Sequence, residues 1–155
     1  MLLSAVAPPI VSAARVKGAA FAKSQGFDAI VMDDGLQNTG LRKDLSIVVI
    51  DGAVGFGNEM LLPAGPLRTP IHAGMKKADA VLIIGADETN VLRHVPEGLP
   101  VLNAAMVPVT PLDTLPEYVA FCGIARPEKF WTTLEQAELK VAEFHKFADH
   151  PPYPQ

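Results

Sequence analysis

Three aspartates stand where apolar stretches of the chain end, and their positions suggest a site for a cation or a phosphate group. Asp33 and Asp34 directly follow one short apolar stretch, and Asp51 directly follows the next. Adjacent carboxylates repel each other unless a cation or an opposed charge compensates. Mg²⁺ prefers carboxylate oxygens together with substrate phosphates. The alternative is a pair of turn-forming or helix-capping aspartates before a glycine, and local chemistry leaves both interpretations open.

The apolar stretches themselves predict an α/β fold with a doubly wound, mostly parallel sheet. Short segments that are continuously apolar are typical of strands buried on both faces, and helix-forming segments alternate with them. In such sheets ligands bind beyond the carboxyl ends of the strands, where the three aspartates would lie. We expect strands at 28–32, 45–51, 79–85 and 99–107, with helices at 12–26, 71–78 and 86–95.

A second unit is predicted after the prolines at 108, 111 and 116, which mark a linker. Beyond them we expect a strand at 118–124, a helix at 126–137 and a further strand that starts near 138. Near the end of the chain, His150 follows Asp149 in a predicted loop. A carboxylate beside an imidazole can tune it for proton transfer, so His150 is a candidate catalytic residue.

Composition narrows the class of protein. The chain has 155 residues and a net charge of -4, so the basic surface that nucleic acids require is absent and no nucleic-acid partner is expected. Its single cysteine, Cys122, allows no disulfide within the chain, which suits a reducing compartment. No stretch approaches the roughly 18–20 apolar residues that a membrane span needs. We therefore expect a cytoplasmic location.

Six segments of the chain occur in this order: DAIVMDDGLQ, LRKDLSIVVID, GFGNEMLLPAGPLRTP, KKADAVLIIG, AFCGIARPEKFWTTL and FADH. Taken together, they resemble the tetraacyldisaccharide 4'-kinases, the lipid A 4'-kinases of Gram-negative bacteria. The resemblance implies a P-loop-NTPase-like kinase with ATP and Mg²⁺ as cofactors. It would phosphorylate the 4'-hydroxyl of a lipid A disaccharide precursor, in peripheral contact with the inner membrane. Residues 1–106 would be the remainder of the N-terminal kinase domain, and 107–155 the linker and the start of the C-terminal domain.

The resemblance also implies roles for individual residues. Asp33 and Asp34 resemble the Walker-B-type acidic pair that organises magnesium and nucleotide, with Asp34 also a catalytic residue. Gln37 matches the glutamine of the same turn, and Arg68 resembles an arginine near the phosphate groups. A planar guanidinium suits bidentate contacts to phosphate. His150 resembles the histidine that the second domain contributes in support of catalysis.

The chain departs from the family pattern at several positions. Thr69 stands where the family usually has glutamate, and Asn38 where it usually has histidine. The phosphate-binding lysine and the catalytic aspartate of the family precede the segments matched here, and no G-x-x-x-x-G-K-[ST] sequence occurs. We therefore expect a fragment of the kinase that is inactive alone. The alternative is a non-catalytic α/β interaction module derived from that kinase.

Overall fold

The chain consists of two compact units, and each contains its own parallel sheet. The computed structural model describes residues 7–107 and 117–148. The units are Met1–Ala104 and Ala105–Gln155. The predicted boundary between 106 and 107 concerns the domains of a longer protein and stays a prediction.

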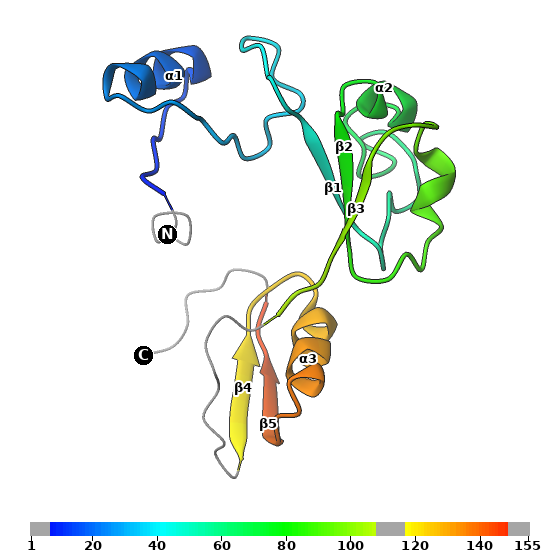
Figure 1. Cartoon of the computed structure of the whole chain (residues 1–155). Helices are drawn as coiled ribbons and strands as arrows, with labels where there is room; N and C mark the ends of the chain where they lie inside the picture. The colour runs from blue at the N-terminus through cyan, green and yellow to red at the C-terminus, as the bar shows by residue number, and fades with distance from the viewer. Residues whose placement is uncertain (1–6, 108–116, 149–155) are drawn as a thin grey trace. The chain divides into compact units, whose positions relative to one another are not determined.

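The first unit is built on a three-stranded parallel sheet in the order β1-β2-β3 (Figure 1). A helix lies between the first two strands in sequence, and a short 3-10 helix lies between the second and third. The α/β class with parallel strands is thereby confirmed. The elements are α1 (Arg15–Ser24), β1 (Ile47–Asp51), α2 (Ile71–Met75), β2 (Ala80–Ile84), η2 (Val91–His94) and β3 (Val101–Ala104).

The hydrophobic core of this unit covers one face of the sheet. In the parallel register Val48 lies beside Val81 and Ile50 lies beside Ile83, so these side chains share a face. Met75 of α2 and Val91 of η2 belong to the same buried cluster. Removing such side chains from water is the main favourable contribution to folding, so α2 and η2 are fixed against the strands.

The strand predicted at 28–32 is absent, so that prediction is wrong. These residues have an irregular backbone and are mostly exposed, and the Val31 side chain is 97 % exposed. A strand exists only when a neighbouring strand takes its backbone hydrogen bonds. Within the described residues the sheet contains only β1, β2 and β3, and none of them pairs with this segment.

The helix predicted at 86–95 is reduced to η2, a single 3-10 turn of 4 residues. Asn90, directly before it, has a φ of 58° and lies in the left-handed region. A residue in that conformation cannot continue a right-handed α-helix. The helical pattern of the sequence is therefore interrupted halfway along the predicted segment.

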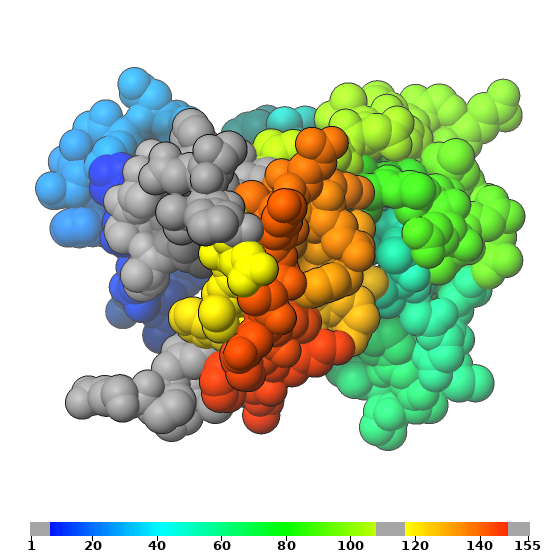
Figure 2. Space-filling model, turned by 90° about the horizontal axis from the view of Figure 1, so that it is seen from below, coloured from blue at the N-terminus to red at the C-terminus, as the bar shows by residue number. Residues whose placement is uncertain are grey.

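The second unit consists of a helix packed on a two-stranded parallel sheet of β4 and β5. The ring centroid of Phe144 in β5 lies 5.2 Å from that of Trp131 and 6.0 Å from that of Phe130, both in α3. The helix and β5 lie side by side in both views, in orange and orange-red (Figures 1 and 2). The predicted strand, helix and strand are thus confirmed, with bounds β4 (Tyr118–Cys122), α3 (Pro127–Gln136) and β5 (Val141–Lys146).

The helices in the described part of the chain are short. The two longest, α1 and α3, have 10 residues each. A helix needs about 20 apolar residues to cross the hydrocarbon core of a bilayer. None of the helices described is long and apolar enough to do so.

Candidate functional site

A cavity in the first unit brings together three of the residues singled out in the sequence. Asp34, Gln37 and Arg68 all line it, and its volume is about 440 Å³. They come from two segments that are separated in the chain by β1. Apolar side chains of β1, of the loop that follows and of α2 complete the wall, among them Val48, Phe56, Leu67, Ile71 and Met75. The cavity therefore combines an apolar wall with a few polar groups, as ligand sites commonly do.

The two aspartates occupy a tight turn. Asp34 has a φ of 52°, in the left-handed region that aspartate tolerates better than most residues. The backbone N–H of Asn38 donates to the carbonyl oxygen of Gly35 at 3.0 Å. Within the described residues neither aspartate side chain has a hydrogen bond or an ion pair. Both carboxylates are exposed and available to a cation.

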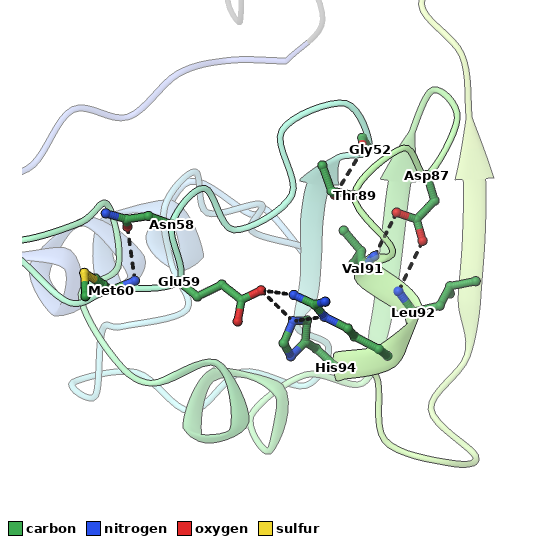
Figure 3. A network of polar contacts seen from close by, with 10 residues as sticks. Gly52, Asn58, Glu59, Met60, Asp87, Thr89, Val91, Leu92 and His94 are labelled. Carbon is green, nitrogen blue, oxygen red and sulfur yellow. Dashed lines mark hydrogen bonds and ion pairs between the residues drawn. The ribbon is translucent and has the colours of Figure 1, made fainter.

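Arg68 lies at the end of a loop that the Asn58 side chain holds closed. Asn58 Nδ2 donates to the carbonyl oxygen of Ala64 at 2.8 Å, and Asn58 Oδ1 accepts from the backbone N–H of Met60 at 3.1 Å (Figure 3 shows the second bond). The N–H of Leu67 donates to the Met60 carbonyl at 3.1 Å. Within the described residues the Arg68 guanidinium has no hydrogen bond or ion pair. It lines the cavity as a cation without a protein counter-charge.

One hydrogen bond joins the two segments that carry the site residues. Gln37 Nε2 donates to Thr69 Oγ1 at 3.0 Å, across a separation of 32 residues in the chain. Both side chains are half-buried, and both line the cavity. The bond ties the turn that contains Asp34 to the segment that contains Arg68.

The glycine-rich loop after β1 is tied to η2 by an ion-pair network (Figure 3). Glu59 accepts from Arg93, and Glu59 Oε1 lies 3.0 Å from His94 Nε2. The hydrogen bond from Arg93, together with that from His94, lowers the pKa of Glu59 below its usual value. The His94 ring also meets the Phe56 ring edge to face, with centroids 5.5 Å apart. The network thus holds a loop whose Phe56 side chain forms part of the cavity wall.

A second set of bonds fixes the start of η2. Asp87 Oδ1 accepts from the N–H of Val91 at 2.8 Å, and Asp87 Oδ2 accepts from the N–H of Leu92 at 3.2 Å (Figure 3). The bond from Val91, supported by those from neighbouring N–H groups, lowers the pKa of Asp87. Thr89 Oγ1 donates to the carbonyl oxygen of Gly52 at 3.2 Å, which joins the same turn to the residue after β1.

The remaining predicted residues lie elsewhere. Asp33 shares the turn with Asp34 but does not line the cavity. Asp51 ends β1 as expected, and its Oδ1 accepts from the N–H of Ala53 at 3.2 Å, which is a turn-forming role. His150 lies outside the described residues. In the described ranges no three or more His, Cys, Asp or Glu side chains gather into a metal site.

Asp33 and Asp34 nevertheless provide the donor set that Mg²⁺ uses when a substrate supplies the other ligands. Mg²⁺ is typically held by one or two carboxylates together with phosphate oxygens and water. The two exposed carboxylates of the turn fit that pattern, and they do not form a complete protein cage.

Sequence reasoning did not predict the contacts that two residues of the site make. Asn58 had a usable signal, because asparagine after glycines favours a turn that is closed by its side chain. Thr69 had none, since its partner is 32 residues away and only the folded chain brings them together.

Comparison with known proteins gives a consistent result. Residues 1–155 match the family model of tetraacyldisaccharide-1-P 4'-kinase. Tetraacyldisaccharide 4'-kinase of Gluconacetobacter diazotrophicus is 47% identical over 155 residues, which cover 99% of this chain and 47% of that protein. The protein of the same name from Rhodospirillum rubrum is 46% identical over 159 residues, which cover 99% and 48%.

A solved structure is also similar. The crystal structure of LpxK from Aquifex aeolicus in complex with ATP aligns with a TM-score of 0.68 at 27% identity. The alignment covers 91% of this chain and 48% of that chain. This chain therefore spans about half the length of the relatives that it matches.

Proposed function

The chain belongs to the tetraacyldisaccharide 4'-kinase family, and we propose on this basis that it forms part of a lipid kinase. The whole enzyme would transfer the γ-phosphoryl group of ATP to the 4'-hydroxyl of a tetraacyldisaccharide 1-phosphate, a precursor of lipid A. The observation that carries the proposal is the cavity shared by Asp34, Gln37 and Arg68. Phosphoryl transfer depends almost entirely on positioning and on electrostatic stabilisation, and these residue types supply both.

Each residue has a proposed task. Arg68 binds phosphate oxygens, because its planar guanidinium is unpaired within the described residues and lines the cavity. Gln37 donates from its amide to the same groups. Asp33 and Asp34 hold Mg²⁺, which neutralises negative charge on the phosphates when it is bound. Asp34, at the cavity, also takes part in catalysis, and His150 of the second unit supports the transfer.

The location follows from the proposed substrates. ATP is a cytoplasmic nucleotide, and a disaccharide with four acyl chains resides in a bilayer. We propose that the whole protein works in the cytoplasm, in peripheral contact with the inner membrane of a Gram-negative bacterium. We also expect the isolated chain to lack activity, because the phosphate-binding lysine of the family would come from a segment outside these 155 residues.

A chimera tests the proposal. This chain replaces the matching segment of the Gluconacetobacter diazotrophicus relative, to which it is 47% identical, and ATP-dependent phosphorylation of the disaccharide lipid is measured. Arg68→Gln and Asp34→Asn are each expected to lower kcat/KM by about 10²-fold or more, as the loss of one transition-state contact does. The matched controls are Arg42→Gln and Asp44→Asn, an ion pair whose side chains are 92% exposed.

The outcome can contradict the proposal in two ways. A folded chimera that transfers phosphate equally well with Arg68→Gln, Asp34→Asn and the controls removes both residues from the site. A folded chimera that has no activity and also shows no MgATP binding by calorimetry favours the non-catalytic module.

A further inference from the structure

We propose that Thr69 is a positioning residue that holds the Gln37 amide in place at the wall of the phosphate-binding cavity. This inference rests on the proposed function. Gln37 Nε2 donates to Thr69 Oγ1 at 3.0 Å, and both side chains are half-buried lining residues of the cavity. Thr69 itself needs no contact with substrate in this role, since it acts through Gln37.

The hydrogen bond decides how the glutamine amide is presented. A glutamine side chain carries one acceptor oxygen and an NH₂ group with two donors. The threonine hydroxyl oxygen takes one N–H of Gln37, and the second N–H remains for another acceptor, such as a phosphate oxygen. A side chain already held in one rotamer loses less conformational entropy when a ligand binds. The bond therefore preorganises Gln37 for an anionic ligand.

The threonine is itself held by rigid neighbours. Pro70 follows it with a φ of -54° and directly precedes α2, and the N–H of Ala73 donates to the Pro70 carbonyl oxygen at 3.0 Å. Met75 at the end of α2 is buried in the core of the unit. The Thr69 hydroxyl is thus attached to a fixed part of the backbone, whereas Gln37 lies in a turn outside the helices and strands. A functional group is placed accurately when its support is rigid. We therefore expect Thr69 to fix the position of Gln37, and not the reverse.

A neutral hydroxyl also suits this place chemically. It accepts a hydrogen bond from the amide without adding negative charge to a wall that already contains Asp34. The glutamate that the family usually has at this position could accept the same hydrogen bond, but it would add a negative charge to the wall. Thr69 therefore positions Gln37 without adding a charge, and Arg68 remains the charged group that this segment presents to the ligand.

The test uses the chimera described above, labelled with ¹⁵N, because it also contains the segment in which the family carries its phosphate-binding lysine. The Gln37 side-chain NH₂ signals are identified by their loss in Gln37→Glu. Thr69→Val removes the hydroxyl at nearly constant volume, and Thr69→Ser retains it. Thr132→Val is the matched control, because Thr132 Oγ1 bonds only within α3, to the carbonyl oxygen of Glu128.

Two readouts are compared. In Thr69→Val the Gln37 NH₂ signals should move toward the values of a solvated glutamine, and MgATP affinity should fall by about 3- to 10-fold, the cost of ordering one side chain. Thr69→Ser should restore both readouts, and Thr132→Val should change neither. A thermal melt of each variant shows that the comparison is between folded proteins.

Each alternative result is decisive. Gln37 signals that stay in place in folded Thr69→Val overturn the contact itself. Signals that move while MgATP affinity is unchanged overturn the positioning role, and the proposed function survives. A wild-type chimera with an intact contact that does not bind MgATP counts against the proposed function and removes the positioning role with it.

Discussion

Gly65→Ala is expected to destabilise the first unit strongly, because other atoms of the loop that precedes Arg68 pack directly against this glycine. A Cβ atom at position 65 would overlap Asn58 Oδ1 and the carbonyl oxygen of Met60. Both atoms are hydrogen-bond acceptors of the same loop, from the N–H groups of Met60 and Leu67. One of the overlapping atoms belongs to the backbone, so the added methyl group cannot be accommodated by a side-chain rotation alone.

The size of the effect follows from two contributions. Forcing an extra methyl group into a filled site costs about 1–3 kcal/mol. Weakening the hydrogen bonds at Asn58 and Met60 adds about 1 kcal/mol, so the total is about 2–4 kcal/mol. For a unit of this size each 1 kcal/mol lowers Tm by roughly 4–8 °C.

The matched control is Gly74→Ala in α2. The nearest atom to a Cβ there is Thr69 Oγ1 at 4.0 Å, which is ordinary van der Waals contact. Alanine in a helix is favoured over glycine by about 0.5–1 kcal/mol, so this variant should be slightly more stable than the wild type. The two glycine-to-alanine changes are thus expected to have opposite signs.

Urea denaturation of both variants and the wild type measures the difference. A Gly65→Ala free energy of unfolding within about 0.5 kcal/mol of the wild type, the range of surface substitutions, would refute the close approach at this position. The same change in the chimera can be tested by titration with MgATP. A shifted loop should weaken binding through Arg68 in the molecules that remain folded.

Two further predictions concern the sheet and η2. Ile83→Ala should lower the free energy of unfolding by about 2–5 kcal/mol because it leaves a cavity in the core, where Ile83 is 1% exposed. Leu102→Ala, at a side chain that is 49% exposed, should cost much less in the same urea experiment, and equal losses would contradict the description of the core. Asp87 has a pKa below its usual 3.8, chiefly because the Val91 N–H donates to it. The folded state therefore binds this proton less readily than the unfolded state, and Asp87 stabilises the fold above about pH 3.8 but loses that effect as the pH falls through the lower folded pKa. The stability difference between wild type and Asp87→Asn, followed by urea denaturation across this range, should narrow at acid pH, and a constant difference would contradict the prediction.

The parts of the fold that could be predicted from sequence are those that a local pattern determines. β1 and β2 were predicted because each is a short apolar stretch rich in β-branched residues. The expected burial on both faces is wrong for β1, where Ile47 is 43% and Val49 57% exposed. The helix α3 was predicted from Pro127 at its first turn and its helix-forming residues.

The parts that failed depend on distant partners. Residues 28–32 have the composition of a strand, but a strand also needs a neighbour, and none of the described strands pairs with it. The Gln37–Thr69 bond is likewise set by the fold, since it spans 32 residues. Arg68 and Gln37 both line the cavity, but their phosphate-binding roles come from family resemblance and stay a prediction.

The backbone at Asp34 separates two aspartates that look equivalent in the sequence. Its φ of 52° costs energy for any residue with a Cβ atom. Such conformations persist where the surrounding structure enforces them, and they are concentrated at functional sites. In this turn Asp34 lines the cavity, whereas Asp33 does not. The two carboxylates therefore have different surroundings although they are neighbours in the sequence, and a site that uses one of them toward the substrate would require such a difference.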